Sequence, residues 1–191
     1  MSNNYFCHES SIIDPGAQIG EGTRIWHFSH IMGTARIGKN CVIGQNVFIG
    51  NNVTIADGVK VQNNVSVYEG VIVEKNVFIG PSVVFTNVIN PRSFIERKSE
   101  FKESLIKEGS SIGANATILC GITIGAYAMI GAGATVTDDV KDFAIVKGIP
   151  ARWSGWVCQC GVKLELNNDA STVCSACGTK YNLNKQNIEI A

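Results

Sequence analysis

An aliphatic or aromatic residue returns at every sixth position between residues 13 and 85. The series is Ile13, Ile19, Ile25, Ile31, Ile37, Ile43, Ile49, Ile55, Val61, Val67, Val73, Ile79 and Phe85. A second series of apolar or small residues follows each member by four positions and runs from Ala17 to Ile89. A helix would repeat every three or four residues, so the spacing excludes one. Alternate residues of a strand face the same side, so each repeat predicts a short strand with two inward side chains and then a corner.

Residues that favour tight corners occupy the positions between these strands. Glycine follows the inward residue at Gly20, Gly38, Gly44, Gly50 and Gly80, and Asn or Asp is frequent at the other corner positions. Both tolerate the positive φ angles that corners need. The pattern predicts an all-β parallel β-helix of hexapeptide repeats, in which residues eighteen apart stack at roughly 4.8 Å if three repeats form one coil. Cys41 fills an inward position, and residues 7–9 form a lead-in or cap.

The repeat is interrupted after Phe85. The next clear inward residue, Ile112, follows after 27 positions, which is not a multiple of six, and the segment between is dense in charge. We predict an inserted loop at about residues 88–108, because solenoids place insertions as loops on one face, often the binding face. A solvated excursion without a role is the alternative. The repeats then resume, with more Ala and Gly, as far as Val136.

Residues 1–152 are predicted to form the repeat domain and residues 153–191 a small separate unit. The unit contains Cys158 and Cys160, then Cys174 and Cys177, with a glycine after each pair. Four thiolates on two tight turns are typical of a structural zinc site of the zinc-ribbon type, and so small a unit would need such a staple. The first spacer is one residue shorter than is common, and free thiols or a disulfide pair are the alternatives.

Composition narrows the class of protein further. Lys and Arg number 16 and Asp and Glu number 16, so no nucleic-acid partner is expected. No apolar run has the length of a membrane span, and the first residues lack the pattern of a secretion signal. We therefore expect a cytoplasmic protein without a membrane span, in which the cysteines stay reduced or bind metal.

The hexads, the interrupting loop and the exit segment 146–152 together resemble the hexapeptide-repeat acyltransferases. That resemblance implies left-handed coils, a homotrimer with sites between subunits, and acetyl-CoA as cosubstrate. Four strings, at residues 25–31, 64–71, 85–92 and 111–117, resemble a narrower group. Its members are bacterial acetyltransferases that modify the 3-amino group of a UDP-2-acetamido-3-amino-2,3-dideoxyglucuronate. The resemblance implies an N-acetyltransferase of that UDP-amino sugar, serving surface polysaccharides such as the O-antigen of lipopolysaccharide.

N-acetylation needs a positioned neutral amine, donors for the oxyanion and a proton acceptor. Asn51, Glu69 and Asn87 are spaced by eighteen, so the predicted coil places them at one corner, where the loop leaves. We expect Asn87 to hold the sugar amine and Glu69 to orient it or accept its proton. An asparagine ladder that satisfies corner backbone groups is the alternative, and we favour it for Asn51.

Substrate contacts are expected from histidines and from the loop. His27 and His30 are candidates, although a surface histidine in a repeat is often a bystander; if neither is the base, the amine binds neutral and loses its proton after attack, even to the departing sulfur. Tyr68 belongs to one of the matching strings. Arg92 and Lys102 are cations for the diphosphate or carboxylate. Solvated loop charge is the alternative for both cations, and we favour that alternative for a third, Arg97.

For acetyl-CoA, the resemblance implies a stripe of small residues along the pantetheine arm and two cations at the nucleotide end. The stripe is Ala114, Gly131 and Ala132, and the cations are Lys141 and Arg152.

Other interpretations remain open. A TDP-linked 6-deoxy amino sugar is an alternative substrate, and a non-catalytic scaffold or ice-binding solenoid is an alternative function. A zinc carbonic anhydrase would need three converging histidines, and the chain has only His8, His27 and His30, of which the last two do not stack. A nucleotidyltransferase would need a further domain for which there is no room.

Overall fold

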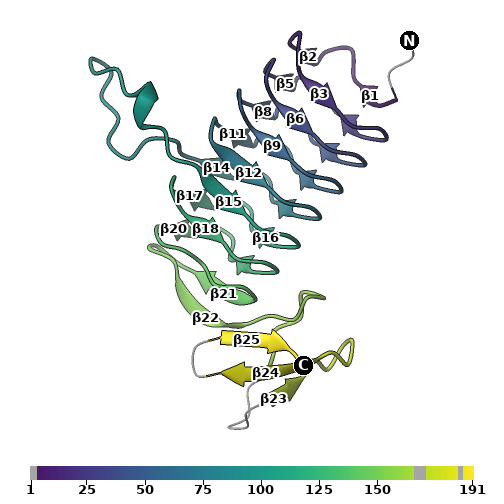
Figure 1. Cartoon of the computed structure of the whole chain (residues 1–191), viewed down its shortest axis with the longest axis vertical. Coiled ribbons are helices and arrows are strands. Elements are labelled where there is room, and N and C mark those ends of the chain that lie inside the picture. Colours follow the sequence, from purple (N-terminus) through teal and green to yellow (C-terminus); the bar gives the residue numbers. More distant parts are fainter. Residues whose placement is uncertain (1–3, 166–170, 185–186) are drawn as a thin grey trace.

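In the computed structural model, which describes residues 4–165, 171–184 and 187–191, the chain winds into a three-sided prism (Figure 1). Sheet A contains β1 (Phe6–Cys7), β4 (Arg24–Ile25), β7 (Val42–Ile43), β10 (Lys60–Val61), β13 (Phe78–Ile79), β16 (Ser111–Ile112), β19 (Met129–Ile130), β21 (Ala144–Lys147) and β22 (Arg152–Trp156). Sheet B contains β2 (Ile12–Ile13), β5 (His30–Ile31), β8 (Phe48–Ile49), β11 (Ser66–Val67), β14 (Val84–Phe85), β17 (Thr117–Ile118) and β20 (Thr135–Val136). Sheet C contains β3 (Gln18–Ile19), β6 (Arg36–Ile37), β9 (Thr54–Ile55), β12 (Val71–Val73), β15 (Ser104–Ile106) and β18 (Thr123–Ile124).

The register confirms three repeats per coil. Ile25 pairs with Ile43 in parallel, and Ile31 pairs with Ile49, so strands eighteen residues apart lie side by side. Successive strands from β1 to β21 therefore belong to different sheets, and the chain turns a corner between them. The predicted all-β parallel β-helix is confirmed.

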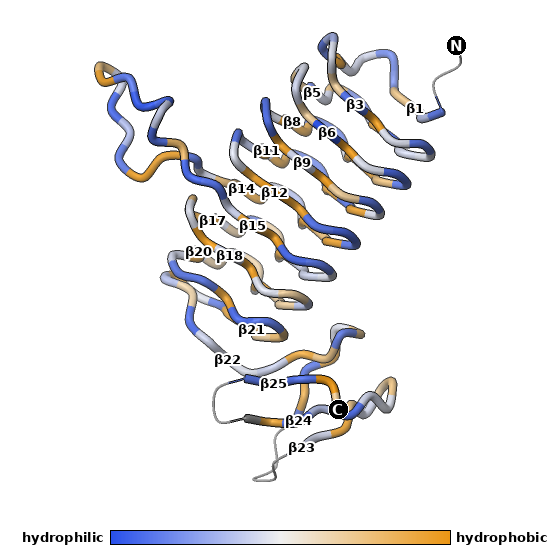
Figure 2. The backbone as a smooth tube through the Cα atoms, viewed as in Figure 1, coloured by the Kyte–Doolittle hydropathy of each residue, from blue (hydrophilic) through white to orange (hydrophobic). Residues whose placement is uncertain are grey.

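The inward positions form one continuous core. Residues of the six-residue series from Ile25 to Phe85 are at most 4% exposed, and Figure 2 shows apolar residues returning along every coil. Cys41 is buried in the second inward series, as expected. Ser29 occupies an equivalent position, where its hydroxyl donates to the carbonyl of Gly44 at 2.8 Å. The prediction for Ile89 is wrong: this residue is 61% exposed, because the chain has already left the coil.

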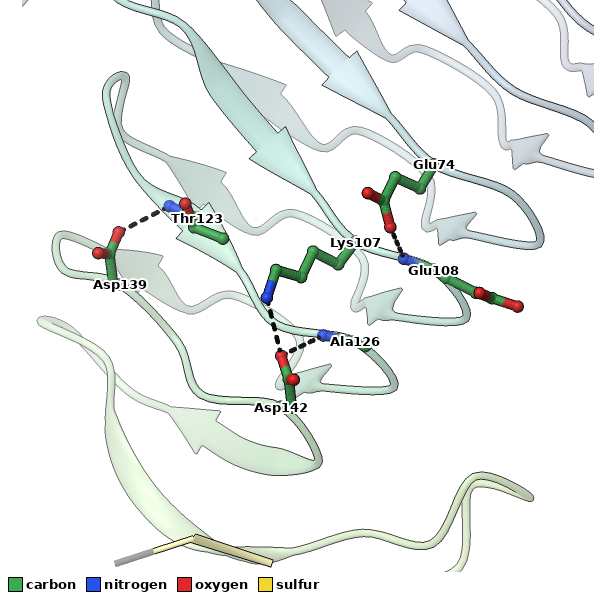
Figure 3. Close-up of polar contacts among 7 residues, drawn as sticks. All are labelled: Glu74, Lys107, Glu108, Thr123, Ala126, Asp139 and Asp142. Atoms are coloured by element: carbon green, nitrogen blue, oxygen red, sulfur yellow. Dashed lines mark hydrogen bonds and ion pairs between the residues drawn. The ribbon is translucent and has the colours of Figure 1, made fainter. Parts of the chain in front are cut away.

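Corners use left-handed residues and side chains that bind backbone amides. Asn64 and Asn115 have φ values of 60° and 58°, which asparagine tolerates better than branched residues do. Glycine is needed where coils approach closely: a Cβ on Gly113 would lie 2.5 Å from the amide nitrogen of Ala132. On the later coils, carboxylates accept bonds from backbone amides of an adjacent coil (Figure 3), including that of Asp142 from Ala126 at 2.8 Å. These contacts lock the coil register.

The inserted loop leaves between β14 and β15 and projects away from the prism (Figure 1). Val71 pairs with Ser104, so the insertion adds fifteen residues to the eighteen of an ordinary coil. The coil thus resumes at Ser104, earlier than the predicted loop end near residue 108. Ile106 is the missed inward residue, and it is fully buried. The loop holds one 3-10 turn, η1 (Lys98–Glu100).

The C-terminal unit follows an antiparallel strand. β22 pairs with β21, so the predicted boundary between residues 152 and 153 falls inside a strand that belongs to sheet A. A three-stranded antiparallel sheet follows: β23 (Ser171–Val173), β24 (Lys180–Asn184) and β25 (Asn187–Ile190). The unit lies at the C-terminal end of the prism (Figure 1). No helix within the described ranges is long and apolar enough to cross a membrane.

Candidate active site

The corner between sheets B and C carries the predicted catalytic column. Asn51, Glu69 and Asn87 each stand two residues after a strand of sheet B, on successive coils, as the spacing predicts. The side-chain amide oxygen of Asn51 accepts two bonds from Thr34, one from the hydroxyl at 3.0 Å and one from the backbone amide at 3.3 Å. Asn51 therefore has the ladder role that we favoured. Glu69 accepts a bond from the side-chain amide of Asn52 at 2.7 Å, and this bond orients its carboxylate.

The base of the inserted loop closes around Asn87. The backbone amide of Lys102 donates to the carbonyl of Asn87 at 3.0 Å, which joins the two ends of the loop. Gly70 lies beside the backbone of Lys102, since a Cβ there would be 3.2 Å from its carbonyl oxygen. Asn87 is half-buried, and Tyr68, next to Glu69, is 41% exposed. The structure thus gathers four predicted residues, Asn87, Glu69, Tyr68 and Lys102, at one corner.

The loop arginines lie farther out. Arg92 is exposed, and its guanidinium donates to the carbonyl of its neighbour Pro91 at 3.0 Å. Arg97 forms two bonds with the Glu100 carboxylate, at 2.7 and 2.8 Å, which stabilise the loop's own turn. No contact between these guanidinium groups and the Asn87 corner is found among the described residues. A role for Arg92 in binding substrate stays a prediction.

The histidines lie near the first coils and away from Asn87. His27 follows β4 at the corner between sheets A and B, where its ring stacks on that of His8 at 3.5 Å. His30 lies on β5 and its Nε2 is 3.1 Å from the Asp14 carboxylate. Three coils separate β5 from β14, so within one chain neither histidine reaches the Asn87 corner.

The small-residue stripe lies at a different corner from Asn87. Ala114, Gly131 and Ala132 follow strands of sheet A, at the corner between sheets A and B. The amide of Gly133 donates to the carbonyl of Ala114 at 2.8 Å, so these turns stack directly. Sheet B separates this stripe from Asn87. A single chain therefore carries the predicted acetyl-CoA stripe and the predicted amine site at opposite edges of one sheet.

A cavity of about 570 Å³ lies at the C-terminal end of the prism. Lys141 and Arg152 both line it, so the structure brings the two predicted cations together. Trp153 and Trp156 line it as well, with ring centroids 5.7 Å apart in an edge-to-face arrangement. Sequence reasoning missed both tryptophans, because they lie outside the repeat and no spacing marks them.

The four C-terminal cysteines meet in one cluster, which confirms their predicted grouping. Their sulfur atoms all lie within 4.8 Å of one another. Cys158 and Cys177 are 3.4 Å apart at sulfur, and Cys160 and Cys174 are 3.6 Å apart. A tetrahedral zinc ion with Zn–S bonds of about 2.3 Å holds its sulfurs roughly 3.8 Å apart. The short Cys158–Cys160 spacer therefore does not prevent a metal-ligating arrangement.

Hydrogen bonds to sulfur support this cluster. Bonds from the hydroxyl and then the amide of Thr179 lower the pKa of the Cys177 thiol to about 6. Tyr181 donates its hydroxyl to the sulfur of Cys158 at 3.1 Å and accepts a bond from the amide of Gln159 at 3.0 Å. Burial raises the pKa of Tyr181, so the phenol stays protonated as a donor. Thr179 and Tyr181 were also missed, and their nearness to Cys177 in sequence was the only signal.

Comparisons with known proteins agree with this fold. Models of the bacterial transferase hexapeptide repeat match residues 16–51, 52–87 and 103–138. The dTDP-3-amino-3,6-dideoxy-alpha-D-galactopyranose 3-N-acetyltransferase of Aneurinibacillus thermoaerophilus is 49% identical over 180 residues, which cover 94% of this chain and 92% of that protein. A 2,3,4,5-tetrahydropyridine-2,6-dicarboxylate N-acetyltransferase of Staphylococcus aureus is 39% identical over 74 residues, 39% of this chain and 28% of its own length.

Two solved structures share the fold at low identity. LpxA, a UDP-N-acetylglucosamine acyltransferase from Bacteroides fragilis, aligns with a TM-score of 0.68 and 22% identity over 80% of this chain and 61% of its own. The acetyltransferase domain of PglB from Neisseria gonorrhoeae, solved with acetyl coenzyme A, aligns with a TM-score of 0.52 and 23% identity over 79% of this chain and 58% of its own. These likenesses concern the fold, whereas the repeat models and the 49% identical relative decide membership. The chain belongs to the hexapeptide-repeat family of bacterial acetyltransferases.

Proposed function

We propose that this chain transfers the acetyl group of acetyl-CoA to the 3-amino group of a dTDP-linked 3-amino-3,6-dideoxyhexose. The observation that supports this is the 49% identity to a dTDP-3-amino-3,6-dideoxy-galactopyranose N-acetyltransferase, which extends over nearly the whole of both chains. The sequence had favoured a UDP-linked uronate and kept the TDP-linked 6-deoxy sugar as the alternative. The comparison favours that alternative, and we adopt it. A role in surface polysaccharide synthesis and a cytoplasmic location stay predictions.

Acetyl transfer from a thioester to an amine requires mainly that the protein hold the two reacting groups in position. The neutral amine attacks the thioester carbonyl, the new N–C bond forms, and the C–S bond breaks as CoA leaves as a thiolate. The proton lost by nitrogen goes to that sulfur, so no separate base is required. In our proposal the side chain of Asn87 accepts a hydrogen bond from the amine, and Glu69 orients it. The bond from Asn52 to Glu69 supports a fixed, orienting role for this carboxylate.

The position of the two corners supports a site shared between copies of the chain. Ala114, Gly131 and Ala132 lie at one edge of sheet B and Asn87 lies at the other. An acetyl group held along the first edge can meet an amine held at the second edge if two copies lie side by side. A ring of three copies repeats this contact three times, and we propose such a homotrimer.

A panel of sugar nucleotides tests the substrate assignment. We expect thiol release from acetyl-CoA with dTDP-3-amino-3,6-dideoxyhexoses, and turnover at least about tenfold slower with the UDP-linked 3-amino uronate, because a site built for a 6-methyl group leaves a carboxylate poorly solvated. Release of the CoA thiol, followed with a chromogenic disulfide, gives kcat/KM for each nucleotide. Faster turnover of the uronate would return the assignment to the UDP-linked sugar.

The histidines provide a second test. If the amine proton leaves with the CoA sulfur, His27→Ala and His30→Ala should each leave kcat within about threefold of the parent between pH 6 and pH 9, with an unchanged shape of the pH profile. Steady-state rates across that range are the measurement. A loss of about 100-fold or more in either variant, with the pH dependence abolished, would identify that histidine as a general base.

The cysteine cluster is proposed to hold one structural zinc ion. Cys158, Cys160, Cys174 and Cys177 supply four sulfurs at mutual distances that fit tetrahedral coordination, and four protein ligands leave no open position for catalysis. The ion would stabilise the C-terminal unit and would not contact the reacting atoms.

A further inference from the structure

A chain of direct contacts joins the cysteine cluster to the last coils of the prism. Tyr181 is fully buried, and its hydroxyl donates to Cys158. Its ring meets Phe143 edge-to-face at 5.6 Å, and Phe143 in turn stacks on Tyr127 at 5.3 Å with an interplanar angle of 12°. Tyr127 and Phe143 are left-handed corner residues of successive coils, with φ values of 55° and 58°. A series of aromatic contacts that begins at one sulfur of the cysteine cluster therefore connects the unit to the solenoid.

The same strand that carries this anchor forms a wall of the cavity. Leu183 stands two residues after Tyr181 on β24 and lines the cavity, as does Asn187 at the start of β25. The two strands pair in antiparallel register within one sheet. The remaining lining comes from the end of the solenoid and β22, and it includes the cations Lys141 and Arg152 as well as Trp156. The carboxylates of Asp138 and Asp139 also line the cavity, and that of Asp138 lies 3.8 Å from the Arg152 guanidinium. The C-terminal unit therefore contributes Leu183 and Asn187 as one wall of a cavity whose other walls belong to the last coils and β22.

The unit has little apolar core of its own. Beyond β22, the buried apolar residues within the described ranges are Val157, Cys158, Leu164, Cys174, Tyr181 and Ile188. Two of these six are members of the cysteine cluster. A segment of this size with so few buried side chains needs a metal or disulfide to fold, because the apolar area that it buries does not offset its chain entropy.

We infer that metal bound by the four cysteines controls the cavity and, through it, the affinity for acetyl-CoA. The ion folds the C-terminal unit, Tyr181 then docks the unit on Phe143, and Leu183 and Asn187 close the cavity around Lys141 and Arg152. The ligand class is the phosphate-bearing nucleotide end of the cosubstrate. The inference rests on the proposed acetyl-CoA and zinc assignments and extends them, because it makes the metal site a determinant of cosubstrate binding.

Metal content and ligand identity are measured first on the full chain. We expect one zinc per chain by elemental analysis and, after replacement with Co²⁺, the thiolate charge-transfer and tetrahedral d–d absorption bands of a four-sulfur site. Cys174→Ser should lose both. Cys41→Ser is the matched control, because Ser29 already occupies the equivalent inward position, and this variant should keep the metal.

Tryptophan emission reports the cavity. The chain has three tryptophans, two of which line the cavity, so Trp26→Phe leaves only these two reporters. Trp156 is 6% exposed, and removing the metal with a chelator should shift its emission to longer wavelength as water reaches it. Adding Zn²⁺ back should reverse the shift. Tyr181→Phe should keep the metal and yet show part of the same shift, since the ring stays against Phe143 while the hydroxyl's bonds with Cys158 and Gln159 are lost.

Kinetics separates this inference from the proposed function. Metal removal should raise KM for acetyl-CoA roughly tenfold, the loss expected for one charge-assisted phosphate contact, and change kcat and the KM for the sugar nucleotide far less. A metal-free protein with reactive thiols would overturn the metal site. Bound metal whose removal leaves both the emission and the KM unchanged would overturn the coupling. Absence of acetyl transfer from every metal-loaded sample would instead refute the proposed function.

Discussion

Replacing Asn87 with alanine should lower kcat for acetyl transfer by about 100-fold, because an amine that is no longer held against the thioester loses the advantage of orientation. Asn87 stands where the inserted loop leaves the coil, and its own backbone carbonyl is fixed by the amide of Lys102. The side chain can therefore be removed while the backbone bond that closes the loop remains. Steady-state rates with acetyl-CoA and a dTDP-3-amino-3,6-dideoxyhexose measure the effect.

Asn51→Ala is the matched control for this prediction. Asn51 lies at the same corner, and its side chain bonds to Thr34 instead of facing the loop. Its removal should reduce stability slightly and leave kcat within about twofold, since it contacts no reacting group. Similar losses of kcat in both variants would indicate that the column is structural. An unchanged rate in Asn87→Ala would remove Asn87 from the mechanism.

The solenoid could be predicted because one physical requirement repeats. Each coil must bury two side chains per face, so a fixed period of six reveals strands, corners and stacking at once. The same reasoning erred where the period gave no guidance. Ile89 matched the spacing and lies in the loop, whereas Ile106 lies in the core and was taken for part of the loop. Hydropathy alone does not say where a chain leaves its register and where it returns.

The site was predictable to the extent that it depends on that register. The spacing of eighteen placed Asn51, Glu69 and Asn87 at one corner, and the strand pairing agrees. The direction of the Glu69 side chain toward Asn52 depends on rotamers and on contacts between coils, which the spacing does not contain. The contact between Tyr181 and Cys158 could not be predicted from the sequence for a similar reason. An antiparallel strand outside the repeat brings the two residues together.

The candidate sites lie where the regular coil is interrupted by the loop and where it ends. Parallel strand pairing determines the structure of the regular coils, because each inward side chain packs against the residue eighteen positions away. The two candidate sites lie where the six-residue period stops. One is the loop base beside Asn87, and the other is the cavity beside Arg152. Both places owe their shape to segments without a six-residue period. The regular coils hold these places at fixed positions relative to one another.

Replacing Ile55 with alanine should lower the free energy of unfolding by about 3 kcal/mol, because a buried branched side chain leaves a cavity that the stacked coils cannot close. Ile55 is 1% exposed and is stacked between Ile37 and Val73. Thr54→Ala, one residue earlier on β9, changes an exposed outward side chain and should cost less than about 0.5 kcal/mol. Urea denaturation of both variants at one protein concentration measures the difference. Equal losses would show that inward stacking does not carry the stability of the prism.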